Sequence, residues 1–288
     1  MWIADKWRDY EVIDTSGGEK LERWGKYTLI RPDPQVIWNT DKKNPLWRGA
    51  DASYKRSRTG GGAWSENKLP ESWVISYGDL KFRIKPMGFK HTGLFPEQAT
   101  NWDWFSDLIR NANREIKVLN LFAYTGGATV AAARAGASVC HVDASKGMVA
   151  AAKENARLSG LEAAPIRYIV DDCKKFVERE IRRGNKYDGI IMDPPSYGRG
   201  PTGEVWKIEE SIDEFVELTS HVLSDNPLFF LLNSYTTGLS ASTMKYITTV
   251  RLLSKLRGRS EADELGLKVG NDSLALPCGS SVRVTFDY

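Results

Sequence analysis

At 288 residues the chain is long enough to bury a sizeable core, as one large domain or as two smaller ones. Hydrophobic residues make up 41% and charged residues 27%, which excludes a disordered chain, and no apolar run approaches the roughly 18 residues of a membrane span. The net charge is +3, but residues 41–91 hold eleven Lys and Arg against five Asp and Glu. This local excess of cations indicates either an anionic partner or only a solvated basic face.

The cysteines and the N-terminus indicate the compartment. Cys140, Cys173 and Cys278 are scattered, which suits neither a disulfide framework nor a metal cluster. Residues 1–6 lack the basic-then-apolar pattern of a signal peptide. We therefore expect a cytoplasmic protein with no metal and no membrane partner.

The first 90 residues predict a small β-rich subdomain. Residues 9–14, 19–24, 26–31, 73–77 and 80–85 read as short strands, and the last of these alternates Leu80, Phe82 and Ile84 inward with charged residues outward. Between them, Lys42 to Lys68 reads as a basic loop with glycines at 60–62. It contains Arg48, Lys55, Arg56 and Arg58, interleaved with the aromatic residues Trp47, Tyr54 and Trp64.

Residues 91–288 predict an α/β domain with a Rossmann-like, mostly parallel sheet covered by helices on both faces. The expected strands are 117–122, 139–143, 166–170, 189–192 and 228–232, and a terminal hairpin lies between Leu267 and Tyr288. The expected helices run from Ala128 to Gly136, from the N-cap Ser145 to Gly160, and over 174–183, 209–223 and 240–256.

Four motifs follow four of these strands, at the sheet edge where ligands of such folds bind. The first is the glycine turn formed by Asn120, Phe122, Ala123, Tyr124, Thr125, Gly126 and Gly127, where the backbone can approach a ligand closely. The second is Asp143, whose carboxylate can accept hydrogen bonds from ribose hydroxyls or could instead cap the next helix. The third is Asp171, Asp172 and Cys173, placed to accept an adenine amino group.

The fourth motif, Asp193-Pro-Pro-Ser-Tyr197, is the most specific. Its prolines keep the turn rigid and supply no N–H, so the Asp193 carboxylate and the Pro194 carbonyl can face one small volume. Tyr197 offers a ring that could stack on a flat substrate. A purely structural proline turn is the alternative.

Together these residues resemble class I S-adenosylmethionine-dependent methyltransferases, and more narrowly the bacterial 23S ribosomal RNA methyltransferase family with its I and K members. The resemblance runs from about Lys90 to the C-terminus and includes Gly93-Leu-Phe-Pro-Glu-Gln98, Phe122 to Gly127 and the turn at Asp193. It implies the class I strand order with an antiparallel last strand, S-adenosylmethionine as cofactor and an RNA substrate. It also implies that Phe95, Glu97, Gln98, Ala144 and Ser145 join the four motifs around the cofactor.

Two features depart from that family. Its members often begin with an RNA-binding PUA domain, which residues 1–90 do not resemble. Its cytosine-5 members use a cysteine after the fifth strand, where this chain has Asn233-Ser-Tyr-Thr236. Because only Cys278 remains as a candidate nucleophile, we expect a nitrogen or oxygen acceptor, although carbon-5 stays open.

The expected reaction is methyl transfer to an RNA nucleobase, with ribosomal RNA favoured. Asp193 and Pro194 position the base, Tyr197 stacks on it and the basic segment binds phosphates. Three alternatives remain, namely a protein or small-molecule methyltransferase, a non-catalytic RNA- or nucleotide-binding module, and a dinucleotide oxidoreductase. The last is disfavoured because the glycines lack the G-x-G-x-x-G spacing.

Overall fold

The computed structural model describes residues 1–57, 61–65, 68–88, 90–199, 205–270 and 273–287. They form two compact units, one made of Met1–Thr100 with Leu265–Cys278 and the other of Asn101–Glu264 with Gly279–Tyr288. The expected boundary between residues 90 and 91 falls inside the first unit. Each unit is described by itself.

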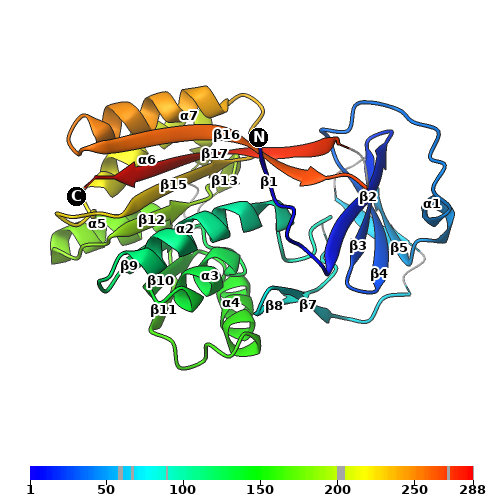
Figure 1. The fold of residues 1–288 in the computed structure, drawn as a ribbon, viewed down its shortest axis with the longest axis horizontal. Helices are drawn as coiled ribbons and strands as arrows, with labels where there is room; N and C mark the ends of the chain where they lie inside the picture. Colours follow the sequence, from blue (N-terminus) through cyan, green and yellow to red (C-terminus); the bar gives the residue numbers. More distant parts are fainter. Residues whose placement is uncertain (58–60, 66–67, 89, 200–204, 271–272, 288) are drawn as a thin grey trace. The chain divides into compact units, whose positions relative to one another are not determined.

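The second unit is built on a parallel sheet with one antiparallel neighbour (Figure 1). Its strands follow the order β16-β17-β15-β12-β9-β10-β11. Their bounds are β9 Lys117–Leu121, β10 Ser138–Asp143, β11 Ile166–Val170, β12 Gly189–Met192, β15 Phe229–Ser234, β16 Gly258–Lys268 and β17 Ala275–Phe286. The five strands from β15 to β11 are parallel, whereas β17 runs antiparallel to β15. This confirms the predicted α/β sheet and its antiparallel strand near the C-terminus.

Helices cover both faces of this sheet because neighbouring strand residues point to opposite sides. Phe230 belongs to a core with Phe176, Phe215 and Met244, which come from three helices on one face. Phe229 points the other way and stacks on Phe105, with ring centroids 5.8 Å apart. The helices are α2 Ala99–Asn111, α3 Gly127–Arg134, α4 Lys146–Leu158, α5 Cys173–Arg183, α6 Ile208–Ser220 and α7 Ala241–Thr248, which continues as the π-helical turn η2 Thr249–Leu253.

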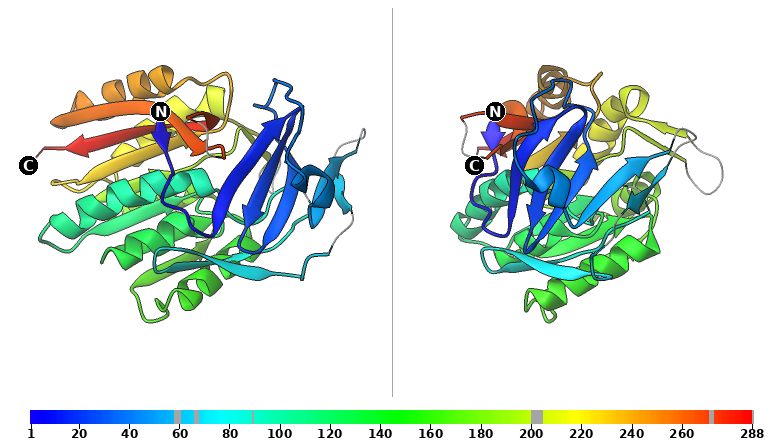
Figure 2. Two further views of the ribbon diagram at one scale, coloured as in Figure 1. Left: turned by 45° about the vertical axis from the view of Figure 1, so that its right-hand side comes forward. Right: turned by 90° about the vertical axis from the view of Figure 1, so that its right-hand side faces the viewer.

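The first unit holds a five-stranded sheet and a hairpin (Figure 2). The elements are β1 Trp2–Ile3, β2 Tyr10–Ser16, β3 Glu19–Trp24, β4 Tyr27–Pro32, α1 Leu46–Gly49, β5 Ala52–Arg56, β6 Gly62–Ser65, β7 Trp73–Tyr77, β8 Leu80–Ile84 and η1 Pro96–Gln98. Strands β2, β3 and β4 form an antiparallel meander, β5 lies parallel to β4, and β6 pairs with β5. The predicted strands are confirmed, as is the inward alternation in β8.

Two predictions about irregular structure were wrong. The segment from Lys42 to Lys68 is not one loop, because it contains α1, β5 and β6, and Tyr54 and Trp64 pair across the two strands with rings 5.4 Å apart. Arg58 and Gly60 lie outside the described residues. The terminal strand pair begins at Gly258 rather than near Leu267.

The interior of the first unit holds a buried charge cluster. Glu22 is fully buried and accepts hydrogen bonds from Tyr10 Oη at 2.6 Å and from Arg31 Nε at 2.6 Å. Burial raises the pKa of this carboxyl, but the positive charges of Arg31 and Lys20 lower it by more, so that the net pKa is about 2. No helix among the described residues is long and apolar enough to cross a membrane.

Candidate functional site

The loop after β9 has a strained backbone. Phe122, Tyr124 and Gly126 have φ angles of +54°, +50° and +81°. A non-glycine residue with positive φ costs about 1–3 kcal/mol and persists only where its surroundings enforce it. Phe122 and Tyr124 stand on either side of Ala123, so the surroundings of this loop must enforce its conformation.

The Asp143 carboxylate at the end of β10 supports that loop. Its Oδ2 accepts a hydrogen bond from Tyr124 N at 2.8 Å, and its Oδ1 accepts one from Ser145 N at 2.8 Å. The helix cap of α4 is the Ser145 hydroxyl, which accepts from Met148 N, so capping is not the role of Asp143. A carboxylate offers about four lone-pair sites. Each oxygen of this half-buried group can therefore still accept a ligand hydroxyl.

The two glycines of the turn are required because a side chain at either position would clash with a neighbouring helix. A Cβ on Gly126 would lie 2.7 Å from Ala152 Cβ, and a Cβ on Gly127 would lie 2.7 Å from Trp102 Cζ2. Both distances are shorter than any normal carbon contact. The turn is therefore pressed onto α4 and α2, and no side chain can be added at either position without moving them.

A buried polar chain that the sequence analysis missed lies beneath the turn. Asn120 Nδ2 donates to Thr129 Oγ1 at 2.9 Å, and Thr129 Oγ1 lies 2.8 Å from His141 Nδ1. His141 is fully buried, and burial lowers its pKa to about 4. The Thr129 hydroxyl accepts from Asn120 and shares its second hydrogen bond with Nδ1 of the neutral His141 imidazole. This chain links β9, α3 and β10 under the loop.

The third motif joins the same edge of the sheet. Asp171 N donates to Asp143 O at 3.1 Å, and the Asp171 carboxylate forms an ion pair with Arg179. Asp172 caps α5 by accepting from Lys175 N at 2.9 Å. The buried Cys173 thiol accepts from Phe122 N at 3.3 Å, and burial raises its pKa. Hydrogen bonds thus hold the ends of β9, β10 and β11 together.

The fourth motif is fixed by aromatic packing. Asp193 is half-buried and Pro194 is buried, whereas Tyr197 is 52% exposed at the start of strand β13 (Tyr197–Arg199), which pairs with β14 (Val205–Lys207). Trp206 Nε1 donates to Pro195 O at 2.6 Å. The rings of Phe122, Trp206 and Phe215 lie 5.6 Å from one another, so the turn after β12 packs beside the loop after β9.

The second unit therefore brings together most of the predicted site residues: Asn120, Phe122, Ala123, Tyr124, Thr125, Gly126, Gly127, Asp143, Ala144, Ser145, Asp171, Asp172, Cys173, Asp193, Pro194 and Tyr197. Phe95, Glu97 and Gln98 belong to the first unit, where Glu97 and Gln98 are buried in η1. Their part in the site stays a prediction. Among the described residues, no group of three or more His, Cys, Asp and Glu side chains could hold a metal ion.

More than half of the chain matches a known protein family. The sequence model of the S-adenosylmethionine-dependent methyltransferase family matches residues 51–214, more than half of the chain. This chain belongs to that family. Its cofactor is therefore S-adenosylmethionine, and the dinucleotide oxidoreductase alternative falls away.

Similar proteins agree with the assignment to this methyltransferase family. An S-adenosylmethionine-dependent methyltransferase from Agrobacterium tumefaciens is 37% identical, with a TM-score of 0.91 over 98% of this chain and 92% of that one. A proposed methyltransferase solved with S-adenosylhomocysteine shares the fold at 20% identity and a TM-score of 0.77, over 98% of this chain and 76% of that one. The ribosomal RNA large subunit methyltransferase K/L of Shewanella frigidimarina is 35% identical over 152 residues, 52% of this chain. The aligned region is only about a fifth of that relative's length.

Proposed function

We propose that this methyltransferase transfers the methyl group of S-adenosylmethionine to a nitrogen or oxygen of a nucleobase in RNA, most favourably ribosomal RNA. The observation that carries the proposal is the rigid Asp193–Tyr197 turn packed beside the loop after β9 through Phe122 and Trp206. The Shewanella relative's name, ribosomal RNA methyltransferase, supports RNA as the substrate class.

The strand ends fit a nucleoside cofactor. Asp143 has lone pairs free for ribose hydroxyls, and its hydrogen bond from Tyr124 N fixes the loop after β9 beside it. In our proposal Asp171 or Asp172 receives the adenine amino group. Phe95, Glu97 and Gln98 complete the site, as the family resemblance implies. When bound, S-adenosylmethionine supplies an electrophilic methyl carbon on a sulfonium centre.

The chain's own residues then have to align the nucleophile with that carbon. The Asp193 carboxylate and the Pro194 carbonyl accept amino protons of the base, and the exposed Tyr197 ring stacks on it. Base–aromatic stacking is worth about 1–3 kcal/mol. Fixing two reactants in line contributes up to about 7–11 kcal/mol, so the reaction needs little covalent assistance from the protein.

Substrate RNA would be held by the basic segment from Lys42 to Lys68 in the first unit. Arg48, Lys55 and Arg56 are all exposed there. Contacts from such side chains to phosphates fix the register of an RNA without reading its sequence.

The test is methyl transfer from labelled S-adenosylmethionine to ribosomal RNA from cells that lack the protein. Mass spectrometry of the digested RNA then identifies the modified nucleoside. We expect Asp193→Asn to lower kcat strongly with little change in cofactor affinity. The matched control is Asp107→Asn, which removes an exposed carboxylate paired with Arg110 on α2. Labelling of protein or small molecules instead of RNA, or full activity of Asp193→Asn, would contradict the proposal.

A further inference from the structure

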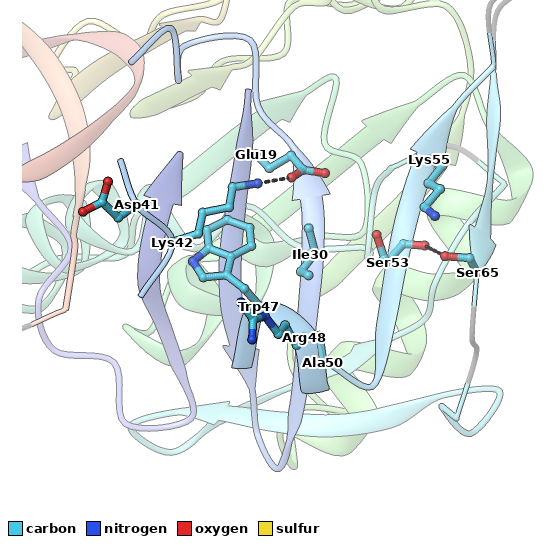
Figure 3. Close-up of a pocket in the computed structure, with 10 residues that line it drawn as sticks. All are labelled: Glu19, Ile30, Asp41, Lys42, Trp47, Arg48, Ala50, Ser53, Lys55 and Ser65. Carbon is cyan, nitrogen blue, oxygen red and sulfur yellow. Dashed lines mark hydrogen bonds and ion pairs between the residues drawn. The ribbon is translucent and has the colours of Figure 1, made fainter. Parts of the chain in front are cut away.

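A polar hollow of about 420 Å³ lies on one face of the five-stranded sheet in the first unit (Figure 3). Its volume falls in the range of about 300–1,000 Å³ that is typical of small-ligand pockets. The lining side chains that matter here are Lys42, Trp47, Arg48, Ser53, Lys55 and Ser65. None of them belongs to the site at the strand ends described above.

The hollow exists because small side chains face it from β5 and β6. Ser53 pairs with Ser65 and Lys55 pairs with Ala63 across the two strands. The large neighbours Tyr54 and Trp64 point to the opposite face, since strand residues alternate. The pairing therefore leaves an open floor of hydroxyl and methyl groups beside the long Lys55 side chain.

The opposite wall of the hollow is held in place by a chain of polar contacts. Trp47 Nε1 donates to Asp14 Oδ2 at 2.7 Å, which fixes the orientation of the indole. Lys42 Nζ lies 4.2 Å from the Trp47 ring centroid and 2.6 Å from Glu19 Oε2. Lys42 is therefore already neutralised and serves the wall rather than a ligand.

Two other cations at the hollow, Arg48 and Lys55, are not neutralised by any acidic side chain that the structure describes. Arg48 and Lys55 are exposed, and among the described residues their side chains make no ion pair or hydrogen bond. The acids that line the hollow, Glu19 and Asp41, are occupied by Lys42 and by Lys43, the latter at 3.3 Å. The uncompensated charge at the hollow is therefore positive and comes from Arg48 and Lys55.

We propose that this hollow binds one nucleotide of single-stranded RNA, with Arg48 and Lys55 contacting its backbone phosphates. The inference rests on the proposed function and adds to it the strand form of the substrate. The concave floor admits a splayed-out nucleotide, whereas a duplex keeps its bases stacked inside and presents only a convex backbone. The Trp47 side of the hollow is already held in place, and the two cations without partners among the described residues can form charge-assisted hydrogen bonds with the phosphates of a bound RNA.

The experiment measures binding of a fluorescein-labelled single-stranded oligoribonucleotide to the full chain, against a hairpin duplex of equal length. Arg48→Ala and Lys55→Ala should each weaken single-strand binding about fivefold near 0.1 M salt and lower the log–log salt slope by about 0.7, the contribution of one phosphate contact. The matched control is Lys26→Ala. Lys26 carries the same charge in the turn between β3 and β4 of the same unit and does not line the hollow, so its loss should stay below about twofold.

Unchanged affinity for S-adenosylhomocysteine shows that each variant is folded. Equal losses for Lys55→Ala and Lys26→Ala would mean diffuse charge attraction and would overturn the inference, as would duplex binding as tight as single-strand binding. If the Arg48 and Lys55 variants bind and methylate RNA as well as the wild-type chain does, the hollow is not an RNA-binding site, and the proposed function is unaffected. If the wild-type chain binds the cofactor but no RNA, RNA is not its substrate and the proposed function is wrong.

Discussion

At the scale of single residues, Asp143 has the most connected position in the site. It supports Tyr124 and Ser145 and keeps lone pairs for a ligand. We expect Asp143→Ala to weaken S-adenosylhomocysteine binding by about 1.5–3 kcal/mol, the range for a hydrogen bond to a charged acceptor. Isothermal titration measures this loss. The exposed-carboxylate variant Asp107→Asn should bind normally, and equal affinities in the two variants would remove Asp143 from the ribose site.

Cys278 decides whether the reaction passes through a covalent intermediate. Its partly buried thiol donates to Leu276 O at 3.4 Å, and burial, together with the Glu97 carboxylate, raises its pKa. A thiolate is the reactive form of cysteine, so this environment disfavours attack on cytosine carbon-5. We expect no covalent adduct with RNA that carries 5-fluorocytosine and normal methyl transfer by Cys278→Ala. An adduct seen on a denaturing gel and lost in Cys278→Ala would make Cys278 the nucleophile.

At the scale of elements, the strained turn between β9 and α3 can be tested with two glycines. Gly126 and Gly160 both have positive φ, but only Gly126 would place a Cβ against a neighbour, Ala152. Gly160→Ala should therefore cost about 1–2 kcal/mol of stability from its backbone conformation alone and leave cofactor binding intact. Gly126→Ala should cost more and lose most of its affinity for S-adenosylhomocysteine. Titration and urea unfolding measure the two effects, and identical behaviour of the variants would show that crowding at Gly126 is unimportant.

Most strands could be predicted because their signal is local. Ile190 to Met192 is an apolar run, and Val118 to Leu121 is apolar apart from Asn120, as expected of buried parallel strands. Helix α2 carries a comparable signal, since Trp102, Phe105 and Ile109 repeat at helical spacing and are all buried.

Other parts of the site depend on contacts that no local pattern encodes. The hydrogen bond of His141 to Thr129 spans twelve residues of sequence and exists only once β10 and α3 have packed. A histidine in a strand carries no sign of such a partner. The β13–β14 hairpin was missed because among its described side chains only Trp206 is half-buried, and it packs on Phe122 and Phe215 from distant elements.

At the scale of the whole molecule, two neutral histidines set a pH limit. Burial lowers the pKa of His141 and of His91 to about 4, against about 6.5 when unfolded. Between these values the unfolded chain binds protons that the folded chain does not, so stability falls as pH is lowered. From pH 7 to about pH 5 the fully buried His141 should cost about 2 kcal/mol, and the half-buried His91 less.

Urea unfolding at the two pH values measures this loss. His141→Gln should reduce the pH dependence even if it lowers stability overall, because glutamine does not titrate. His221→Gln is the control for replacing an exposed histidine, and it should retain the loss of stability because it keeps His141. A wild-type chain equally stable at both pH values would contradict the buried, neutral state.

The final prediction concerns how the whole chain meets RNA. Because each neutralised phosphate releases counterions, affinity for a ribosomal RNA fragment should fall steeply between about 50 and about 200 mM salt. The triple variant Lys55/Arg56/Arg58→Ala should bind more weakly and show a shallower salt dependence, which anisotropy titrations at several salt concentrations measure.

The control for that variant removes the same net charge from the second unit. Arg110, Arg182 and Lys245 are exposed on α2, α5 and α7, and their joint replacement by Ala lowers the net charge equally. If overall charge alone drew RNA to the protein, both triple variants would lose affinity to the same extent. We expect the loss only in the first-unit variant, because phosphate contacts act within about a Debye length, which is about 10 Å at 0.1 M salt. If the affinity does not depend on salt, or if the two triple variants lose affinity equally, the basic segment does not bind RNA specifically.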